Sequence, residues 1–474
     1  MKGISKHMNH INKELRIGIV PTRRKVFDHP EAERRKNEVL NKIKGFEETM
    51  KFTGIYIDDL VGEGLLKDYD ESLIVRERML SEKVDALFIP HCNFGQEEAI
   101  ARLSKDLNVP VLIWGPRDAA PDGYNFRPTD SQCGMFASTK VLQRYNVTFS
   151  YIENCSVEDP VFEKEFAQFL AVANVIKAFR NMRIAVISTR PKEFLSVMIN
   201  EAELLEKFDI ELVPCESTVL IGMIENHLKN NTEGKEKILK DMDDKGIDMS
   251  RLGDKKDAWA SVILALIEFA KMHKCTAIAS ECWRMIRTHY GFMPCSVFGE
   301  LYDYGIPCTC ETDVHGAILS AMAIAARRYE TPAYLADLTI RHPHNENAEL
   351  LWHCGPYAKS LKKGPDGHIV ESGQAYFEII HGEHTLMRFD GLKGEYYMFV
   401  GKGKGVDGPV TNGTYLWMET DNWVHWEKKF MFGPYIHHVV GIPGDITAVM
   451  RESCRYLGIH YDCADSNEFV YNLS

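Results

Sequence analysis

The sequence lacks an excess of basic residues, a long apolar run and a leader-like N-terminus. Lysine and arginine number 56 against 68 aspartates and glutamates, which gives a formal net charge of -12. This balance argues against nucleic acid as a partner, because binding to phosphates needs a basic stripe. No stretch is long and apolar enough to cross a membrane, and residues 1–15 lack the apolar core of a secretion signal. We therefore expect a cytoplasmic protein without a membrane partner.

The cysteines show none of the spacing that marks a metal finger or a redox motif. There are 12 of them, and no two form a Cys-x-x-Cys pair. Several, such as Cys275, Cys308 and Cys310, lie within apolar segments, where cysteine behaves as a small apolar side chain. We interpret them as reduced, buried thiols rather than as a disulfide framework.

Length and hydrophobic patterning predict three domains. A chain of 474 residues is too long for one ordinary core. Strands and helices alternate twice along the chain, which predicts two Rossmann-like α/β domains with parallel sheets, at residues 1–155 and 156–332. Residues 333–474 contain short β segments separated by glycine and asparagine turns, which predicts a mainly antiparallel, barrel-like third domain.

Particular segments carry this assignment. We expect a first strand at Arg16–Pro21 and a long charged helix at about Pro30–Lys51. In the second domain we expect a helix at Leu195–Phe208 and a buried strand at Ile306–Glu311. A further helix, Asp313–Tyr329, closes that domain.

Glu311 is the first candidate site residue, because it stands at the carboxyl end of a predicted parallel strand. Ligands of α/β sheets bind at such strand ends, and an unpaired buried carboxylate is costly. Asp313 follows where the next helix begins, and it fits the N-cap of that helix. We therefore predict a functional role for Glu311 and a capping role for Asp313.

Two later elements supply the other groups of a metal site. Asp337 follows the apolar segment Ala333–Ala336, although taken alone it fits a turn equally well. His437 and His438 precede an apolar strand, and neighbouring strand residues point to opposite faces, so one of the two faces a site. Two carboxylates and an imidazole suit Mn²⁺ or Mg²⁺ better than a structural zinc. The same carboxylates can move a proton next to a carbonyl group.

Five further residues are candidates for contacts with a substrate. Arg23 and Arg24 follow the first strand, where arginines bind anions or sugar hydroxyls, although a solvated turn is an equal alternative. Trp114 ends another strand, where an indole can form the wall of a sugar pocket. Glu281 is a second carboxylate at a strand end, and the neighbours of His353 predict that it is enclosed.

These residues resemble the L-fucose isomerase family, which is related to the L-arabinose isomerases. The resemblance extends weakly over most of the chain and is sharpest in the acidic and histidine elements. The stretches that carry it are Ile17–Arg24, Ile113–Gly115, Cys310–Asp313, Ala336–Asp337 and His437–Val439.

The resemblance implies an aldose–ketose isomerase that works through a cis-enediol. It implies that Glu311, Asp337 and His438 hold Mn²⁺, with Mg²⁺ or Co²⁺ as substitutes, and that the two carboxylates move the proton. Which carboxylate acts first stays open, as does the choice between His437 and His438. The implied substrate is a hexose or deoxyhexose such as fucose, or the sulfonated sugar sulfoquinovose. Family members also imply a homohexamer.

Two other classes of protein stay open on the sequence. One is a non-catalytic sugar-binding protein built on two α/β domains, which would not need a carboxylate pair with a histidine. The other is a metal-dependent epimerase or aldolase that uses the same enediol chemistry. Tight binding of Mn²⁺ would argue against the sugar-binding protein. Analysis of the products would distinguish an epimerase or aldolase from an isomerase.

Overall fold

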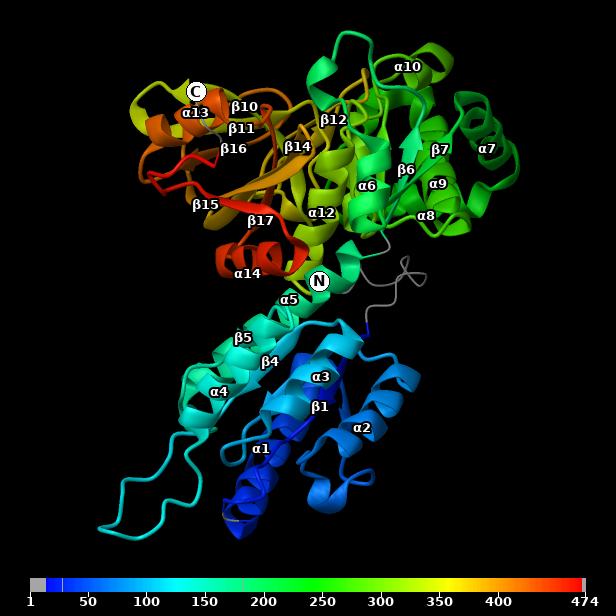
Figure 1. Cartoon of the computed structure of the whole chain (residues 1–474). Helices are drawn as coiled ribbons and strands as arrows, with labels where there is room; N and C mark the ends of the chain where they lie inside the picture. Colours follow the sequence, from blue (N-terminus) through cyan, green and yellow to red (C-terminus); the bar gives the residue numbers. More distant parts are fainter. Residues whose placement is uncertain (1–13, 28, 181, 471–474) are drawn as a thin grey trace. The chain divides into compact units, whose positions relative to one another are not determined.

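The computed structural model describes residues 14–27, 29–180 and 182–470, which divide into two units between Lys177 and Ala178 (Figure 1). Among the described residues, no helix combines the length and the apolar character needed to cross a bilayer.

The N-terminal unit is built on a parallel sheet, as the alternating pattern predicts. All neighbouring strands run parallel in the order β2-β1-β3-β4-β5, which is a doubly wound arrangement. The strands are β1 (Arg16–Ile19), β2 (Thr53–Tyr56), β3 (Ala86–Pro90), β4 (Val111–Trp114) and β5 (Ser150–Tyr151).

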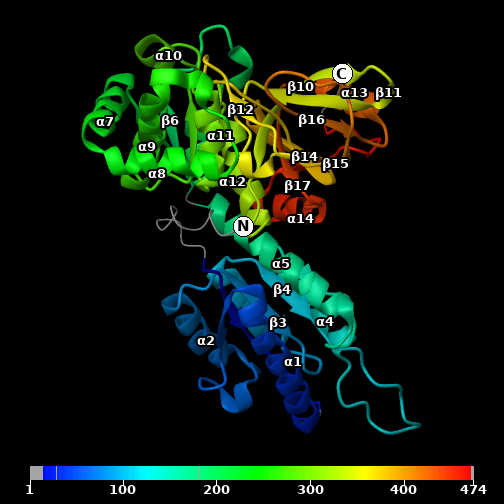
Figure 2. The same ribbon diagram turned by 180° about the vertical axis from the view of Figure 1, so that it is seen from behind.

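Helices cover both faces of this sheet, because successive strand residues point to opposite sides. Phe88 and Leu112 pack with helices α1 and α5, whereas Leu87 and Ile113 pack with α2, α3 and α4. Figure 2 shows the same elements from behind. The helices are α1 (His29–Met50), α2 (Tyr69–Ser81), α3 (Glu97–Leu107), α4 (Ser131–Arg144) and α5 (Pro160–Phe179).

Helix α5 belongs almost entirely to the N-terminal unit, which extends to Lys177. The predicted boundary after residue 155 assigns this helix to the second domain instead. The physical reason for the difference is packing: Phe162, Phe166 and Leu170 of α5 lie in the core formed with β3 and β4.

The second unit begins with another parallel sheet. Its order, β7-β6-β8-β9, repeats that of the first four strands of the N-terminal sheet. The strands are β6 (Arg183–Ile187), β7 (Glu211–Cys215), β8 (Ala277–Ser280) and β9 (Cys308–Thr309). The helices are α6 (Glu201–Phe208), α7 (Ser217–Asn230), α8 (Thr232–Asp244), α9 (Lys256–Met272), α10 (Met285–Tyr290), α11 (Cys295–Asp303) and α12 (Val314–Ala326).

The single helix predicted at Leu195–Phe208 is wrong in its first half. A short 3-10 turn occupies Leu195–Val197, and α6 starts only at Glu201. The Asn200 side chain accepts a hydrogen bond from the Glu203 backbone N–H and so caps the later start.

The rest of the second unit forms the predicted antiparallel barrel. Strands β16, β11, β10, β17, β14 and β15 pair in that order, and β15 pairs with β16 to close the ring. The strands are β10 (Tyr334–His342), β11 (Asn345–His353), β12 (His368–Ile369), β13 (Ala375–Glu378), β14 (Glu383–Leu392), β15 (Glu395–Val406), β16 (Thr414–Glu419), β17 (His438–Pro443) and β18 (His460–Cys463). Two helices accompany them, α13 (Trp423–Phe432) and α14 (Thr447–Leu457).

Helix α12 joins the parallel sheet to the barrel. All of its residues are buried, and it contacts β8 and β9 as well as β10, β14 and β17 (Figure 1). Its near-continuous run of alanine, isoleucine, leucine and methionine allows burial on all sides. The loop before α12 is therefore fixed close to the start of β10 and β17.

Candidate active site

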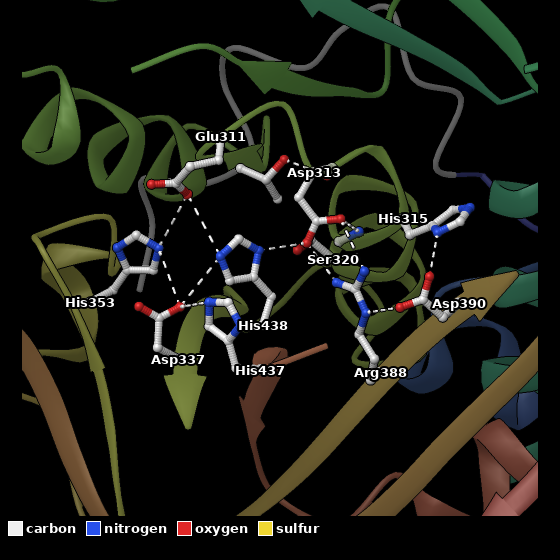
Figure 3. Close-up of polar contacts among 12 residues, drawn as sticks. Glu311, Asp313, His315, Ser320, Asp337, His353, Arg388, Asp390, His437 and His438 are labelled. Carbon is white, nitrogen blue, oxygen red and sulfur yellow. Dashed lines mark hydrogen bonds and ion pairs between the residues drawn. The ribbon is translucent and has the colours of Figure 1, made fainter. Parts of the chain in front are cut away.

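Glu311, Asp337 and His438 come together from three elements (Figure 3). Glu311 lies in the loop between β9 and α12, Asp337 lies in β10, and His438 is the first residue of β17. Strands β10 and β17 are antiparallel neighbours, and their register places Asp337 directly opposite His438. Directly opposed side chains on one face of a sheet are close neighbours.

His353, at the end of β11, completes what we call the carboxylate–histidine cluster: Glu311, Asp337, His353 and His438. His438 Nε2 lies 3.4 Å from Asp337 Oδ1 and 3.7 Å from Glu311 Oε2. His353 Nε2 lies 3.9 Å and 3.8 Å from the same two oxygens. These separations exceed hydrogen-bond lengths, so the four atoms converge without bonding one another.

The donor atoms of this cluster fit a bound cation. Within the described residues, Glu311 Oε2, Asp337 Oδ1 and His353 Nε2 are buried and have no hydrogen-bond partner. Such unpaired polar atoms are costly and are rare in native proteins. Together with the Nε2 atom of His438, the two carboxylate oxygens form a ligand set that suits Mn²⁺.

Glu311 is held in a strained conformation. Its φ of 52° and the φ of 60° at Thr312 lie in the left-handed region, which costs energy for residues other than glycine and persists where the surroundings enforce it. Glu311 Oε1 accepts hydrogen bonds from Trp283 Nε1 at 3.2 Å and from Cys282 Sγ at 3.5 Å, which leaves Oε2 facing the cluster. Burial raises the pKa of the Glu311 carboxyl above its usual value.

The structure distinguishes the two neighbouring histidines. The His438 side chain is 2% exposed, and its Nδ1 lies 3.0 Å from Asp313 Oδ2, so Nδ1 carries a proton and the Nε2 lone pair faces the cluster. The His437 side chain is 47% exposed, with Nε2 3.9 Å from Asp337 Oδ1. His438 is thus the better-placed ligand, and His437 lies at the solvent side.

A second group of polar residues orients His438. We call it the arginine cluster: Arg388, Asp313, Asp390 and His315 (Figure 3). Arg388 Nη1 donates to Asp313 Oδ2 at 2.6 Å, and Arg388 Nε donates to Asp390 Oδ2 at 2.9 Å. Burial opposes the charge of Asp313, but Arg388 and His438 outweigh it and hold the pKa of that carboxyl well below its usual range.

The capping role predicted for Asp313 is confirmed, since its Oδ1 accepts the Gly316 backbone N–H at 3.0 Å. Its contact with His438 was not predicted, and neither was Arg388. The available signal was an arginine inside the apolar run Leu386–Phe389, where a charged side chain needs a buried partner.

His353 presents an N–H group to the cluster. Its Nδ1 accepts the Cys354 backbone N–H at 2.9 Å, so the neutral ring carries its proton on Nε2. In either protonation state Nε2 is a donor, which suits a contact with a substrate oxygen better than coordination of a metal.

Glu281 shapes the loop that supports Glu311. Its carboxylate accepts backbone N–H groups from Trp283 and Arg284 at 2.8 Å and from Met285 at 3.2 Å. This loop places the Trp283 indole against Glu311. The predicted contact of Glu281 with substrate stays a prediction.

The other three candidates lie in the N-terminal unit. Arg23 is 9% exposed, with Nη2 3.5 Å from Glu63 Oε2. Arg24 stacks over the ring of Phe94 at 4.2 Å. Substrate contacts of both arginines stay predictions.

Trp114 packs in the core of its own unit, and its predicted contact with a sugar stays a prediction. It is 2% exposed, and its ring packs edge-on against Phe162 with centroids 4.8 Å apart. The strand end faces the core formed with α5, so the indole contributes to packing.

Sequence analysis missed one aromatic neighbour of the cluster. The ring of Phe194, in the loop after β6, lies 5.2 Å from the ring of His438 and 5.6 Å from that of His437. Its position just beyond the carboxyl end of a parallel strand was the available signal.

Known proteins resemble this chain along most of its length. The sequence model described as fucose/sulfoquinovose isomerase, N-terminal domain, matches residues 18–180. The sulfoquinovose isomerases of Priestia aryabhattai and Priestia megaterium are each 24% identical over 457 residues, covering 93% of this chain and 97% of their own. The sulfoquinovose isomerase of Clostridium sp. is 25% identical over 60% of this chain and 62% of its own.

Among solved structures, an ABC transporter solute-binding protein from Burkholderia multivorans aligns with 67% of this chain and 96% of its own. The identity is 11% and the TM-score is 0.18, which is too low to indicate a common fold.

Two parallel-sheet domains, an antiparallel barrel and a carboxylate–histidine cluster, together with these relatives, define an aldose–ketose isomerase. The match of residues 18–180 to the fucose/sulfoquinovose isomerase model, and the similarity to these relatives over most of the chain, support the resemblance seen in its motifs.

Proposed function

We propose that this isomerase interconverts sulfoquinovose and its 2-ketose, and that Glu311, Asp337 and His438 hold Mn²⁺ for the reaction. The observation that supports the metal is the convergence of two buried carboxylate oxygens, Glu311 Oε2 and Asp337 Oδ1, on His438 Nε2; among the described residues neither oxygen has a hydrogen-bond partner. The substrate is proposed from the names of the relatives and from a cationic cavity described below.

The chemistry follows from the positions of the side chains. A bound Mn²⁺ would polarise the carbonyl group of the open-chain sugar and lower the pKa of the neighbouring hydroxyl group. Glu311, whose pKa burial raises, takes the proton from C2 and gives the cis-enediol. Asp337 manages the proton at C1 and the hydroxyl groups, and His353 Nε2–H donates to a sugar oxygen.

A cavity of about 270 Å³ in the same unit is suited to the sulfonate group. It lies at the carboxyl edge of the second sheet, beside the point where connections from β6 and β8 diverge, and sheets of this type bind ligands there. The Glu281 carboxylate also lines this cavity, but it accepts three backbone N–H groups of its own loop. The other side chains that carry the polar surface of the cavity are Ser188, Thr189, Arg190, Ser217, Arg284, Thr288 and His289.

Two arginines give this cavity its charge. Arg190 Nη1 donates to the backbone oxygens of Pro191 and Phe194, and in the described part of the chain its charge has no carboxylate partner within salt-bridge distance. Arg284 pairs with Glu193 at 3.2 Å, but both side chains are largely exposed, so that pair is weak. The loop that carries Arg284 also carries Trp283, which contacts Glu311.

Proton NMR in D₂O tests the reaction and its substrate together. Sulfoquinovose, fucose, arabinose, rhamnose and glucose are each incubated with the protein, with and without Mn²⁺. We expect Mn²⁺-dependent ketose formation and deuterium incorporation at C2 with sulfoquinovose. Cleavage of the sugar into two fragments would instead indicate an aldolase, and a 2-epimer without ketose would indicate an epimerase.

The cavity is tested with Arg190→Gln. We expect a KM for sulfoquinovose about 10- to 100-fold higher, as for loss of a charged hydrogen bond, and an unchanged KM for a neutral hexose that the enzyme also turns over. Arg251→Gln, an exposed arginine of the same unit, is the matched control. Equal effects of both variants would remove the sulfonate assignment.

The metal ligands are tested with His438→Gln and His437→Gln. We expect Mn²⁺ to be lost from the first variant and retained by the second, measured by metal analysis after gel filtration. The same column coupled to light scattering tests the proposed homohexamer. Cytoplasmic location stays a prediction.

A further inference from the structure

Three cysteines gather beside the carboxylate–histidine cluster, next to His353. They are Cys310 directly after β9, Cys354 after β11, and Cys295 at the start of α11. Cys295 Sγ and Cys354 Sγ are 3.0 Å apart. Cys310 Sγ, Cys354 Sγ and a ring nitrogen of His353 all lie within 4.8 Å of one another.

These thiols differ from buried cysteines elsewhere in the chain. Cys92, Cys215 and Cys275 each have a backbone carbonyl oxygen near their thiol, as isolated buried cysteines commonly do. Cys354 instead contacts another thiol and the Nδ1 atom of His353, at 3.3 Å.

We propose that Cys310, Cys354 and His353 Nδ1 form a binding site for a thiophilic divalent cation of the zinc class, with Cys295 beside Cys354 as a fourth candidate ligand. We call it the sulfur site. Tetrahedral zinc with Zn–S bonds of about 2.3 Å places its sulfur ligands about 3.8 Å apart. Cys310 Sγ and Cys354 Sγ lie within 4.8 Å of each other, which is compatible with that value, and Cys295 Sγ lies 3.0 Å from Cys354 Sγ.

The sulfur site is chemically distinct from the carboxylate–histidine cluster. Thiolates select soft cations, whereas carboxylate oxygens select Mn²⁺ or Mg²⁺. On binding, each thiol releases its proton to solvent, and the cation takes the sulfur lone pairs, so no oxidant or reductant takes part. The inference does not depend on which sugar the enzyme uses.

His353 connects the two sites. Figure 3 shows one ring nitrogen pointing toward Glu311 and Asp337 and the other pointing away from them. A cation on Nδ1 would take the lone pair that accepts the Cys354 backbone N–H. Occupancy of the sulfur site would therefore change the ring that presents its N–H to the substrate.

Titration of the Mn²⁺-loaded protein with Co²⁺ tests the sulfur site, because thiolate coordination gives an intense near-ultraviolet charge-transfer band. We expect a saturable band at one Co²⁺ per chain. Cys354→Ser and Cys310→Ser should each abolish it, whereas Cys133→Ser, which removes an exposed thiol, should keep it. Glu311→Gln should also keep it, since that carboxylate serves the other site.

A second measurement uses the unmodified sequence and so does not depend on the folding of a variant. Cys354 is partly exposed, and we expect Cd²⁺ to protect it from alkylation, followed by mass spectrometry, at least tenfold more than it protects Cys133. Equal alkylation of Cys354 with and without Cd²⁺ would overturn the proposal. A charge-transfer band that survives in Cys354→Ser would also overturn it.

Discussion

Two groups of buried polar residues share the imidazole ring of His438. In one group the charged side chains are paired by hydrogen bonds, whereas several polar atoms of the other group have no partner in the part of the chain that the structure describes. In the arginine cluster, charged groups pair at ordinary hydrogen-bond lengths, such as 2.6 Å between Arg388 and Asp313. In the carboxylate–histidine cluster, the nearest approach is 3.4 Å, and three atoms have no partner among the described residues. His438 belongs to both, with Nδ1 on the paired side and Nε2 on the unpaired side.

The difference teaches how a site is kept ready for a ligand. The paired cluster fixes the ring and its tautomer, and so aims the Nε2 lone pair. The carboxylate–histidine cluster contains buried polar atoms without hydrogen-bond partners in the described chain. Such atoms destabilise the protein without a ligand, but they are available to bind one. We expect the first group to control stability and orientation, and the second to control chemistry.

Removing the Glu311 carboxylate, whose Oε2 atom has no hydrogen-bond partner among the described residues, should have the largest effect. Glu311→Gln keeps the size of the side chain but removes the proton acceptor, so we expect kcat to fall by about 10²- to 10⁴-fold. Steady-state kinetics with Mn²⁺ measure this, and circular dichroism should show an unchanged fold. Full activity in this variant would contradict the assignment of the cluster as the active site.

Breaking the paired cluster should mainly change stability. Arg388→Met leaves the carboxylates of Asp313 and Asp390 buried without their cation, and loss of one partner of a buried pair costs about 3–5 kcal/mol. Urea denaturation measures the free energy of unfolding. Met is long enough to fill most of the space, so a near-zero change would show that the charges are not needed.

The link between the two clusters predicts a smaller effect on metal affinity. Asp313→Asn preserves shape but weakens the hold on His438 Nδ1, so we expect Mn²⁺ to bind about 10- to 100-fold more weakly. Calorimetric titration of the apo protein with Mn²⁺ tests this. Asp390→Asn, which does not contact His438, should change the affinity less, and the reverse order would contradict the linkage.

A buried carboxylate away from the carboxylate–histidine cluster provides a control for this comparison, and we expect its replacement to have the smallest effect. Glu349 in β11 is 5% exposed, and burial raises its pKa to about 7. Because the folded state holds this proton more tightly, stability should fall as the pH rises from about 4.5 to about 7. We expect Glu349→Gln to flatten that dependence by about 1–2 kcal/mol while Mn²⁺ binding stays unchanged. Thermal unfolding of both proteins across this pH range measures the pH dependence of stability, and equal slopes would contradict the prediction.

Local patterns were sufficient for much of the fold. The strand before Glu311 and the cap at Asp313 follow from an apolar run and a short polar side chain before a helix, although the strand covers only Cys308–Thr309 of the predicted Ile306–Glu311. The hairpin of β10 and β11 was missed, because its outer half is polar and Asp337 also fits a turn. The place of α5 could not be read from periodicity, since a helix with an apolar face fits either neighbouring core.

By itself the sequence determined the order of parallel and antiparallel elements, the carboxylates and histidines proposed for the site and the resemblance to known isomerases, because these depend on local periodicity and short motifs. Only the tertiary structure decided which histidine faces the carboxylates, that Arg388 holds the Asp313 side chain that orients this histidine, and that His353 stands between carboxylates and thiols. Those facts depend on the register of β10 against β17 and on the packing of α12, which join residues far apart in the chain. Contacts over such separations leave no periodic signal in one sequence.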